Sequence, residues 1–456
     1  MCRLVALASI ICTGSAFAAS PFPAAALANS AAEQAPGNDA FSRMKSSLPW
    51  QIALTQHEGT GKDDEQLTKL QQSVSVATDP RAQLERLGWL FVAKARSSHD
   101  SGYYKLAEQC ALALLVQDGT SPDALLLKGH VAQSLHRFSE AEAIGRQLVA
   151  QRELAFDHGL LGDALADQGK LDEAIAAYQR MVDLRPELQS YSRVAHVRWL
   201  RGDLEGAIEA ATLAVRAAGA PHVEAAAWAY TRLAALHLQA RSITEAWAAF
   251  ETASAFVPDY PPALLLGGRM LLAAGKSVEA ADLLQRAVAK NPLPEYQWAL
   301  TDALRGADRA KEAGAVEAEL RRAGAATDPR TYALFLATRG EQIDLALRLS
   351  RRELKDRSDI FTYDALAWAL TAAGHHAEAW AAMDRALAEG TQEARLFLHA
   401  AVIAVRLRRD DAAIWLARAR GLEGLLLPSE REQLDQAAGI MDANAARGVH
   451  APSETG

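Results

Sequence analysis

The chain has few cysteines and few aromatic residues. Cys2, Cys12 and Cys110 are the only cysteines among 456 residues, and aromatic residues make up 6%. The first two lie in a segment that we expect to be removed, and one remaining thiol cannot form an internal disulfide. A disulfide-stabilised scaffold is therefore excluded, and we expect Cys110 to be a small buried apolar residue.

The chain also lacks an excess of basic residues. Lysine and arginine number 48 against 56 aspartate and glutamate residues, for a formal net charge of −8, and the two signs are interspersed. A nucleic-acid-binding protein needs a basic face. We therefore expect no nucleic-acid partner, and we also expect no transmembrane segment.

Motifs for catalysis are missing as well. The sequence contains no HExxH pair, Walker loop, GxSxG elbow or paired CxxC. His375 and His376, with Glu378 nearby, are adjacent residues in an expected turn, so they point in different directions and predict a solvated turn, not a metal site. We therefore expect no enzyme activity and no cofactor.

Residues 1–19 have the pattern of a secretory signal peptide. Arg3 precedes an apolar stretch of nine residues from Leu4 to Cys12, and Ala16-Phe17-Ala18 offers a small-x-small cleavage site. The apolar stretch is too short to span a bilayer, which takes about 20 residues. We expect cleavage near Ala18/Ala19 and a periplasmic or secreted protein.

The clearest structural signal is the stretch from Gly162 to Pro186, GDALADQGKLDEAIAAYQRMVDLRP. Gly169 suits the end of one helix, because glycine tolerates a positive φ. The second run carries apolar residues three and four positions apart, from Leu171 to Met181, and Pro186 ends it. Each helix is too short to be stable alone. The stretch predicts a helical hairpin that packs against copies of itself.

Similar copies recur along the chain. A small residue early in each second helix marks them: Ala107, Ala141, Ala174, Ala207, Ala246, Ala280, Ala313, Ala346, Ala379 and Ala412. Most steps are 33 or 34 residues, and the longer step from Ala207 to Ala246 indicates a short insertion near 217–223. A helical hairpin repeated at about 34 residues is typical of the tetratricopeptide repeat.

The chain resembles the tetratricopeptide-repeat family. The best copy matches the family motif at seven positions, which are His158, Leu161, Gly162, Leu165, Ala174, Tyr178 and Pro186. Arg198 and Glu317 depart from it, because they stand where an apolar residue and an aromatic residue are expected. The resemblance implies an all-α fold, a right-handed superhelical solenoid of about ten helix-turn-helix repeats with terminal capping helices.

The expected organisation has six segments. A signal peptide (1–19) and a disordered linker (20–39) precede N-terminal capping helices (40–79). The solenoid follows (80–424), then a C-terminal capping helix (425–444) and a disordered tail (445–456).

In this family the first helix of each hairpin lines the concave surface, and certain positions face the ligand. Those positions predict a binding groove of mixed aromatic and charged residues: Phe156, Asp163, His196, Trp199, Trp228, Arg269, Trp298, Asp302, Phe335, Asp364 and Trp368. We expect a non-enzymatic exported scaffold that binds a protein or peptide segment in this groove. The alternative is a solenoid that binds a carbohydrate or another small ligand, because tryptophan with aspartate and histidine also suits stacking on sugars.

Overall fold

The computed structural model describes residues 41–218 and 223–449. Within these residues the chain forms 24 α-helices and one short 3-10 helix, with no strand. Contacts divide the chain into two compact units at Ser190/Tyr191. The predicted signal peptide and linker lie outside the described residues.

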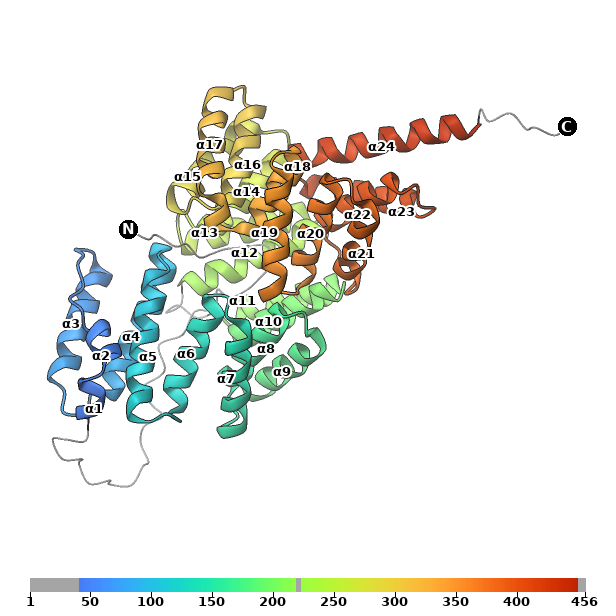
Figure 1. The fold of residues 1–456 in the computed structure, drawn as a ribbon. Helices are drawn as coiled ribbons and strands as arrows, with labels where there is room; N and C mark the ends of the chain where they lie inside the picture. The colour runs from blue at the N-terminus through green and yellow to red at the C-terminus, as the bar shows by residue number, and fades with distance from the viewer. Residues whose placement is uncertain (1–40, 219–222, 450–456) are drawn as a thin grey trace. The chain divides into compact units, whose positions relative to one another are not determined.

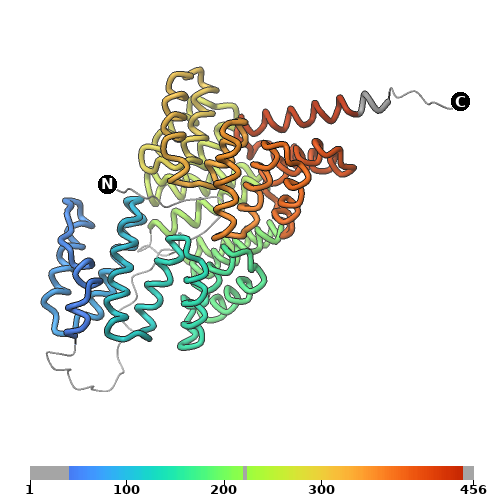
Figure 2. Tube along the Cα trace, viewed as in Figure 1, coloured from blue at the N-terminus to red at the C-terminus, as the bar shows by residue number. Residues whose placement is uncertain are grey.

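The helices follow one another as short antiparallel pairs (Figures 1 and 2). Unit 1 contains α1 (Ser42–Lys45), α2 (Leu48–Ala53), α3 (Lys62–Val76), α4 (Arg81–Ser98), α5 (Gly102–Gln117), α6 (Pro122–Ser134), α7 (Phe138–Gln151), α8 (Ala155–Asp167) and α9 (Leu171–Leu184). α10 (Leu188–Leu200) spans the division.

Unit 2 continues with α11 (Leu204–Arg216), α12 (Val223–Gln239), α13 (Ile243–Phe256), α14 (Pro261–Ala273), α15 (Ser277–Lys290), α16 (Pro294–Gly306), α17 (Ala310–Thr327), α18 (Pro329–Arg339), α19 (Ile343–Asp356), α20 (Ile360–Ala372), α21 (His376–Leu387), α22 (Ala394–Arg406), α23 (Ala412–Gly421), η1 (Glu423–Leu425) and α24 (Pro428–Val449). The predicted C-terminal helix is α24, which runs five residues past its predicted end at 444.

Each hairpin turns through at least one residue in the left-handed region. Gly169 takes φ 71° between α8 and α9, and the Lys170 N–H donates back to the Leu165 carbonyl at 2.9 Å. This bond satisfies a carbonyl that the end of α8 would otherwise leave open. Other hairpins place His136 or Asp308 at the same position, with φ near 60°. The turn predicted at Gly169 is confirmed.

The ten alanines that mark the repeats are all buried. Eight of them, Ala141 and Ala174 included, have no exposed surface, and Ala412 retains 6%. A side chain larger than alanine would overpack these contacts between helices. Gly162 is equally constrained, since a Cβ there would lie 2.4 Å from the Tyr178 ring. The all-α repeat fold is therefore confirmed, and Cys110 is fully buried as expected.

Neighbouring first helices pack directly on one another within each unit. α4, α6 and α8 do so in unit 1, and α12, α14, α16, α18, α20 and α22 do so in unit 2. Neighbouring second helices make no comparable contacts among the described residues. The first helices therefore form the crowded inner side of each unit, which we call the first-helix face.

The N-terminal end of unit 1 is covered by α1 to α3. Asp64, in the first turn of α3, accepts hydrogen bonds from the Gly61 N–H and from His57, and pairs with Lys94 of α4 at 2.6 Å. These bonds, with Lys94 first among them, hold the pKa of Asp64 well below its usual range. The three short helices are thereby tied to the first hairpin.

Unit 2 closes on itself where α10 meets the region around α20 and α21. The Thr391 hydroxyl donates to the Leu200 carbonyl at 2.6 Å, and Trp199 stacks on Phe361 with ring centroids 5.8 Å apart. Gly202 takes φ 76°, and a Cβ there would lie 2.5 Å from the Gly390 carbonyl oxygen. The closure needs glycine at this position, because both the conformation and the space exclude a side chain.

Candidate functional site

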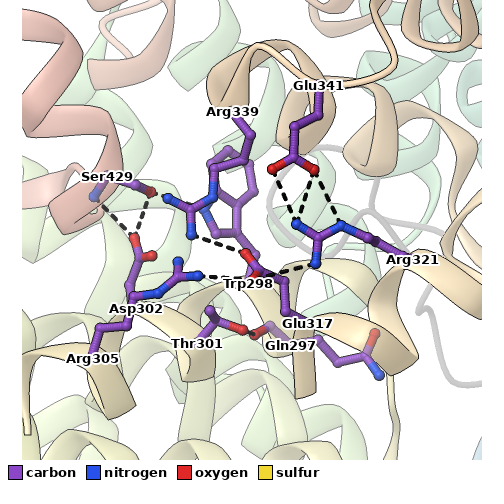
Figure 3. A network of polar contacts seen from close by, with 10 residues as sticks. All are labelled: Gln297, Trp298, Thr301, Asp302, Arg305, Glu317, Arg321, Arg339, Glu341 and Ser429. Carbon is purple, nitrogen blue, oxygen red and sulfur yellow. Dashed lines mark hydrogen bonds and ion pairs between the residues drawn. The ribbon is translucent and has the colours of Figure 1, made fainter. Parts of the chain in front are cut away.

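The first turn of α24 lies on the first-helix face of unit 2. Ser429 is the centre of the contact: its N–H and its hydroxyl both donate to one carboxylate oxygen of Asp302, at 3.0 and 2.5 Å (Figure 3). The Trp298 indole N–H donates to the Ser429 hydroxyl at 2.9 Å. Both groove residues belong to α16, so α16 holds the start of α24 from one side.

Asp302 acts as a helix cap supplied by a different helix. The first N–H groups of α24 have no partner within their own helix. A carboxylate placed there accepts one of them and also interacts favourably with the helix dipole. Burial raises the pKa of Asp302 to about 6, against the lowering effect of the Ser429 hydrogen bonds. The site thus pairs a buried carboxylate with a helix N-terminus.

Two arginines complete the contact with this segment. Arg269 of α14 donates to the Leu425 carbonyl at 2.6 Å and pairs with Glu295 at 3.2 Å. Arg395 of α22 pairs with Glu430 of α24 at 2.5 Å. Burial opposes ionisation of Glu430, but Arg395 and Arg269 outweigh it and keep the pKa of this carboxyl below its usual value. Two arginines therefore receive the acidic residue of the first turn, within a buried charge cluster that also contains Glu295 and Glu393.

Apolar residues on either side anchor the same segment. Leu426 and Leu427, just before α24, and Leu434 and Ala437, on its inner side, are buried in the core of unit 2. The Gln433 amide donates to the Thr338 carbonyl of α18 at 3.2 Å. In Figure 1, α24 accordingly begins beside α18 and α22.

A second polar cluster extends across α18, α20 and α22. His399 pairs with Asp364 through Nδ1 at 2.7 Å and stacks on Trp368 with ring centroids 4.1 Å apart. The Trp368 indole N–H donates to the Thr338 hydroxyl at 2.9 Å. His399 is 1% exposed and Asp364 2%. This aspartate–histidine pair is enclosed by aromatic and apolar side chains, so its arrangement is that of a packed core.

Glu317 explains one departure from the repeat pattern. It stands where other copies carry an aromatic residue, and it is buried. Arg305 and Arg339 contact its carboxylate at 2.8 and 2.9 Å, and Arg321 lies at 3.3 Å (Figure 3). Three guanidinium groups thus offset the burial of one carboxylate. Arg321 also pairs with Glu341, which joins α17 to the end of α18.

A small pocket lies between α10, α11 and α12, lined by Ser192, His196, Trp228 and Arg232 among others. Its volume of about 10 Å³ is the room that one water molecule needs. Burial, helped by the charge of Arg232, lowers the pKa of His196 to about 3. His196 is therefore a neutral side chain at physiological pH.

A sequence model described as "Tetratricopeptide repeat" matches residues 158–188. Residues 158–188 are therefore a tetratricopeptide repeat. The matched stretch covers α8 and α9, the hairpin whose turn and buried alanine recur in the other hairpins. No curated protein matches the chain.

Solved structures with the same kind of fold share little sequence with it. PilF of Pseudomonas aeruginosa is 19% identical over 48% of this chain and 95% of its own, with a TM-score of 0.36. A human IFIT1 dimer with m7Gppp-AAAA is 16% identical, over 72% and 76%, with a TM-score of 0.47. A human IFIT1 dimer with PPP-AAAA is 13% identical, over 78% and 95%, with a TM-score of 0.45. At these identities and TM-scores, the similarity supports no statement about this chain.

Two absences hold for the described residues of this repeat protein. No helix among them is long and apolar enough to cross a bilayer. No group of three or more histidine, cysteine, aspartate or glutamate residues among them could hold a metal ion. His375 lies in the turn before α21, exposed and within 3.1 Å of Glu378.

The predicted groove residues of unit 2 are brought together, but inside the protein. Trp298, Asp302 and Arg269 meet the chain's own C-terminal segment. Asp364 and Trp368 meet His399. Phe335 is also fully buried, edge-on to Trp298 at 5.7 Å, and Trp199 lies in the closure of the unit. Their binding of a partner stays a prediction.

The two predicted residues of unit 1 lie differently. Phe156 is half-buried beneath the guanidinium of Arg185, 5.3 Å from the ring centre. Asp163 is also half-buried, and it accepts a hydrogen bond from the Tyr178 hydroxyl at 2.9 Å. Both residues remain accessible in part on the first-helix face of this unit.

Sequence reasoning did not name two further residues of this face, Trp89 on α4 and His130 on α6. Their rings lie 5.4 Å apart, and both are half-buried. Each follows a glycine, Gly88 or Gly129, that abuts the next first helix. α4 is longer than α6 and α8, so counting repeat positions back from Ala107 does not reach Trp89. The preceding glycine, Gly88, is the sequence signal that locates Trp89.

Sequence reasoning also missed three residues that form the contact at the start of α24. Ser429, Glu430 and Arg395 were not among the predicted residues. Pro428 and Glu430 do mark a helix start, since proline is favoured at the first position and a glutamate two residues later caps it. Indeed, Glu430 accepts a hydrogen bond from the Leu427 N–H at 2.8 Å. Nothing in that local pattern indicates which surface the helix will meet.

Proposed function

We propose that the protein is a non-enzymatic, exported scaffold that binds a segment of a partner protein on the first-helix face of unit 1. One observation carries the proposal: the corresponding face of unit 2 already holds a polypeptide segment, Leu425 to Gln433, through side chains of first helices. Such a face is therefore suited to holding peptide backbone and side chains.

The first-helix face of unit 1 offers the chemistry for such a contact. Trp89 and Phe156 are only partly covered by their own unit. Partly exposed tryptophan is a frequent anchor in protein interfaces. Glu85 accepts a hydrogen bond from the Trp89 indole N–H at 3.3 Å, and burial together with the charge of Asp123 raises the pKa of Glu85. Arg152 pairs with Asp123 and Asp157. An apolar residue flanked by a positive charge is the partner feature that fits this surface.

The saccharide-binding alternative has less support from the structure. Stacking on a sugar needs an accessible ring face, and Trp228, Trp298 and Trp368 are 6%, 0% and 3% exposed. Export is proposed from the pattern of residues 1–19. The absence of a nucleic-acid partner likewise stays an expectation from charge.

The experiment places a photo-crosslinking amino acid at Phe156 and, as the control, at Leu184, which is exposed on the second helix α9. A partner crosslinked from Phe156 alone is identified, and its contacting segment is synthesised and titrated against the purified chain. Trp89→Ala should weaken that binding about tenfold or more, the loss of an aromatic anchor. Leu184→Ala should leave it unchanged.

Equal crosslinking from both positions, or a titration that Trp89→Ala does not affect, would overturn the proposal. Far-ultraviolet circular dichroism of each variant confirms that the helices are intact before binding is compared.

A further inference from the structure

The first turn of α24 sits on unit 2 as a bound ligand would. Its backbone N–H, its hydroxyl and its acidic side chain are all received by residues of other helices: Asp302, Trp298 and Arg395. We propose that this site is a receptor for the N-terminus of a partner's helix that carries a hydroxyl residue followed by an acidic residue. The chain's own Leu425–Leu434 segment, which we call the C-terminal latch, is its resident occupant.

The recognition chemistry is specific to a helix start. Asp302 accepts an N–H that the first turn of a helix leaves without a partner in its own helix. The Ser429 oxygen accepts from Trp298 while its hydrogen is donated to Asp302, so a side chain with both a donor and an acceptor is required. A helix interior offers no such combination, because its N–H groups are bonded within the helix.

Charge selects the next residue. Arg395 and Arg269 surround Glu430, and Arg395 also lies over the Trp298 ring, 5.3 Å from its centre. When the latch leaves, Arg395 loses its nearest carboxylate. Glu295 and Glu393 also act on Arg395, but the ion pair that Arg395 forms at 2.5 Å is with Glu430. An acidic residue from a partner restores this pair, whereas a basic residue would leave it unformed.

The latch is suited to exchange because of its place in the chain. Its covalent connection to the rest of unit 2 is at one end, where η1 follows α23 and leads into the latch at Leu425. Its attachment to the site is made of a few side-chain hydrogen bonds, two ion-paired arginines and four apolar side chains. A tethered segment acts at an effective concentration of about millimolar, so a partner must outcompete it.

The inference rests on the proposed function in one respect, that first-helix faces bind protein segments. It concerns a different unit, however, so the two can fail separately. The unit 1 proposal is tested at Trp89, and the present one at residues of α24 that unit 1 does not contain.

The test weakens the latch without altering the receptor. A full-length variant with Ser429→Ala and Glu430→Gln keeps Asp302, Trp298 and Arg395. The probe is a fluorescein-labelled synthetic peptide of residues 423–441. We expect the variant to bind it at least about tenfold more tightly than the wild-type chain does, because the resident competitor is weakened. Glu432→Gln, on the exposed side of α24, is the matched control and should behave as wild type.

The peptide itself is then varied. Peptides with the serine replaced by alanine, or the following glutamate by lysine, should lose most of their binding. Trp89→Ala added to the weakened variant should leave peptide binding unchanged, which separates this site from unit 1. Should the double variant unfold, Ser429→Ala alone takes its place.

Three outcomes overturn the inference. The first is a folded variant whose α24 amides exchange hydrogen faster than in the wild type but which binds no peptide. The second is equal binding of the native and altered peptides. The third is self-association of the variant with concentration, which would show the occupant to be a second copy's α24.

Discussion

The first-helix faces of the two units have different coverage. In unit 1, Trp89 and His130 are half-buried and packed against each other. In unit 2, Trp298 and Asp302 are buried beneath the start of α24. The helices that carry them are built in the same way, with a buried alanine and a left-handed turn in each hairpin. The difference comes from a segment more than a hundred residues away in sequence.

Coverage changes the role of the same kind of residue. The half-buried indole of Trp89 in unit 1 offers apolar surface to a partner. In Trp298, by contrast, the N–H donates to Ser429 and the ring packs against Phe335. Coverage also changes the role of an aspartate. The pKa of Asp302 rises to about 6 through burial, and the residue caps a helix. Side-chain identity at an inner position therefore does not define a binding residue until the covering segments are known.

The sharpest test of the comparison replaces one tryptophan from each face. Trp298→Ala should destabilise unit 2 by about 3–5 kcal/mol, because it leaves a large cavity in a packed core. Trp89→Ala should cost unit 1 only about 1 kcal/mol, the usual cost of a partly exposed residue. Urea unfolding followed by circular dichroism gives the free energies, and hydrogen exchange assigns each loss to its unit.

Two results would contradict this expectation. Equal losses in the two variants would mean that the two faces are equally covered. Faster exchange of unit 1 amides in Trp298→Ala would mean that the contact is not confined to unit 2.

The closure of unit 2 supplies the second test. Gly202→Ala should cost about 2–4 kcal/mol, since the added Cβ meets the Gly390 carbonyl and the left-handed backbone is strained as well. Gly275→Ala is the matched control: its φ of 72° is similar, but no atom lies within 4 Å of the added Cβ. It should cost only the backbone strain, about 1–2 kcal/mol. Thermal unfolding of the two variants measures the difference, and equal melting temperatures would argue against a tight closure.

Much of the fold could be predicted from sequence because its determinants are local. Gly169 predicts a left-handed turn, and the spacing of Ala141 and Ala174 predicts close helix contacts; the structure confirms both. The sequence shows that Glu317 replaces the expected aromatic residue, but it does not show which groups offset the burial of its charge. Arg305 and Arg339 come from two other helices, and only the fold places them around one carboxylate.

The site was harder to predict for the same reason. Counting positions within a repeat predicted one face for Trp298, Asp302 and Arg269, and in the structure all three contact residues 425–429. It could not show that Ser429 would lie against them, because a separation of 127 residues in sequence leaves no periodic signal. The position of a residue within its repeat predicts the surface on which it lies. Contacts between segments distant in sequence decide whether that surface is exposed or covered.

The third test concerns pH and the covered face alone. Burial raises the pKa of Asp302 to about 6, from a model-peptide value of 3.8. A carboxyl whose pKa is raised in the folded state favours folding while it is protonated, so this contribution is lost as pH rises from about 4 to 6. Asp302→Asn keeps an acceptor for Ser429 but does not titrate. The gap in unfolding free energy between wild type and variant should therefore change by about 2 kcal/mol across that range.

The difference between wild type and Asp302→Asn is the quantity to measure, because other titrating groups nearby change the stability with pH in the opposite sense. The pKa of Glu430 is lowered by Arg395 and Arg269 against its burial, so its contribution is lost as pH falls, and the charge of Arg305 also acts on Asp302. Both groups are common to wild type and variant. Urea unfolding at pH 4, 5, 6 and 7 gives the gap directly, and a gap that stays constant would show that water reaches Asp302. Unit 1 has the same groups in both chains, including Asp64 and Asp157 at its own helix starts, so hydrogen exchange in α6 and α8 should show no difference between the two chains at any of these pH values.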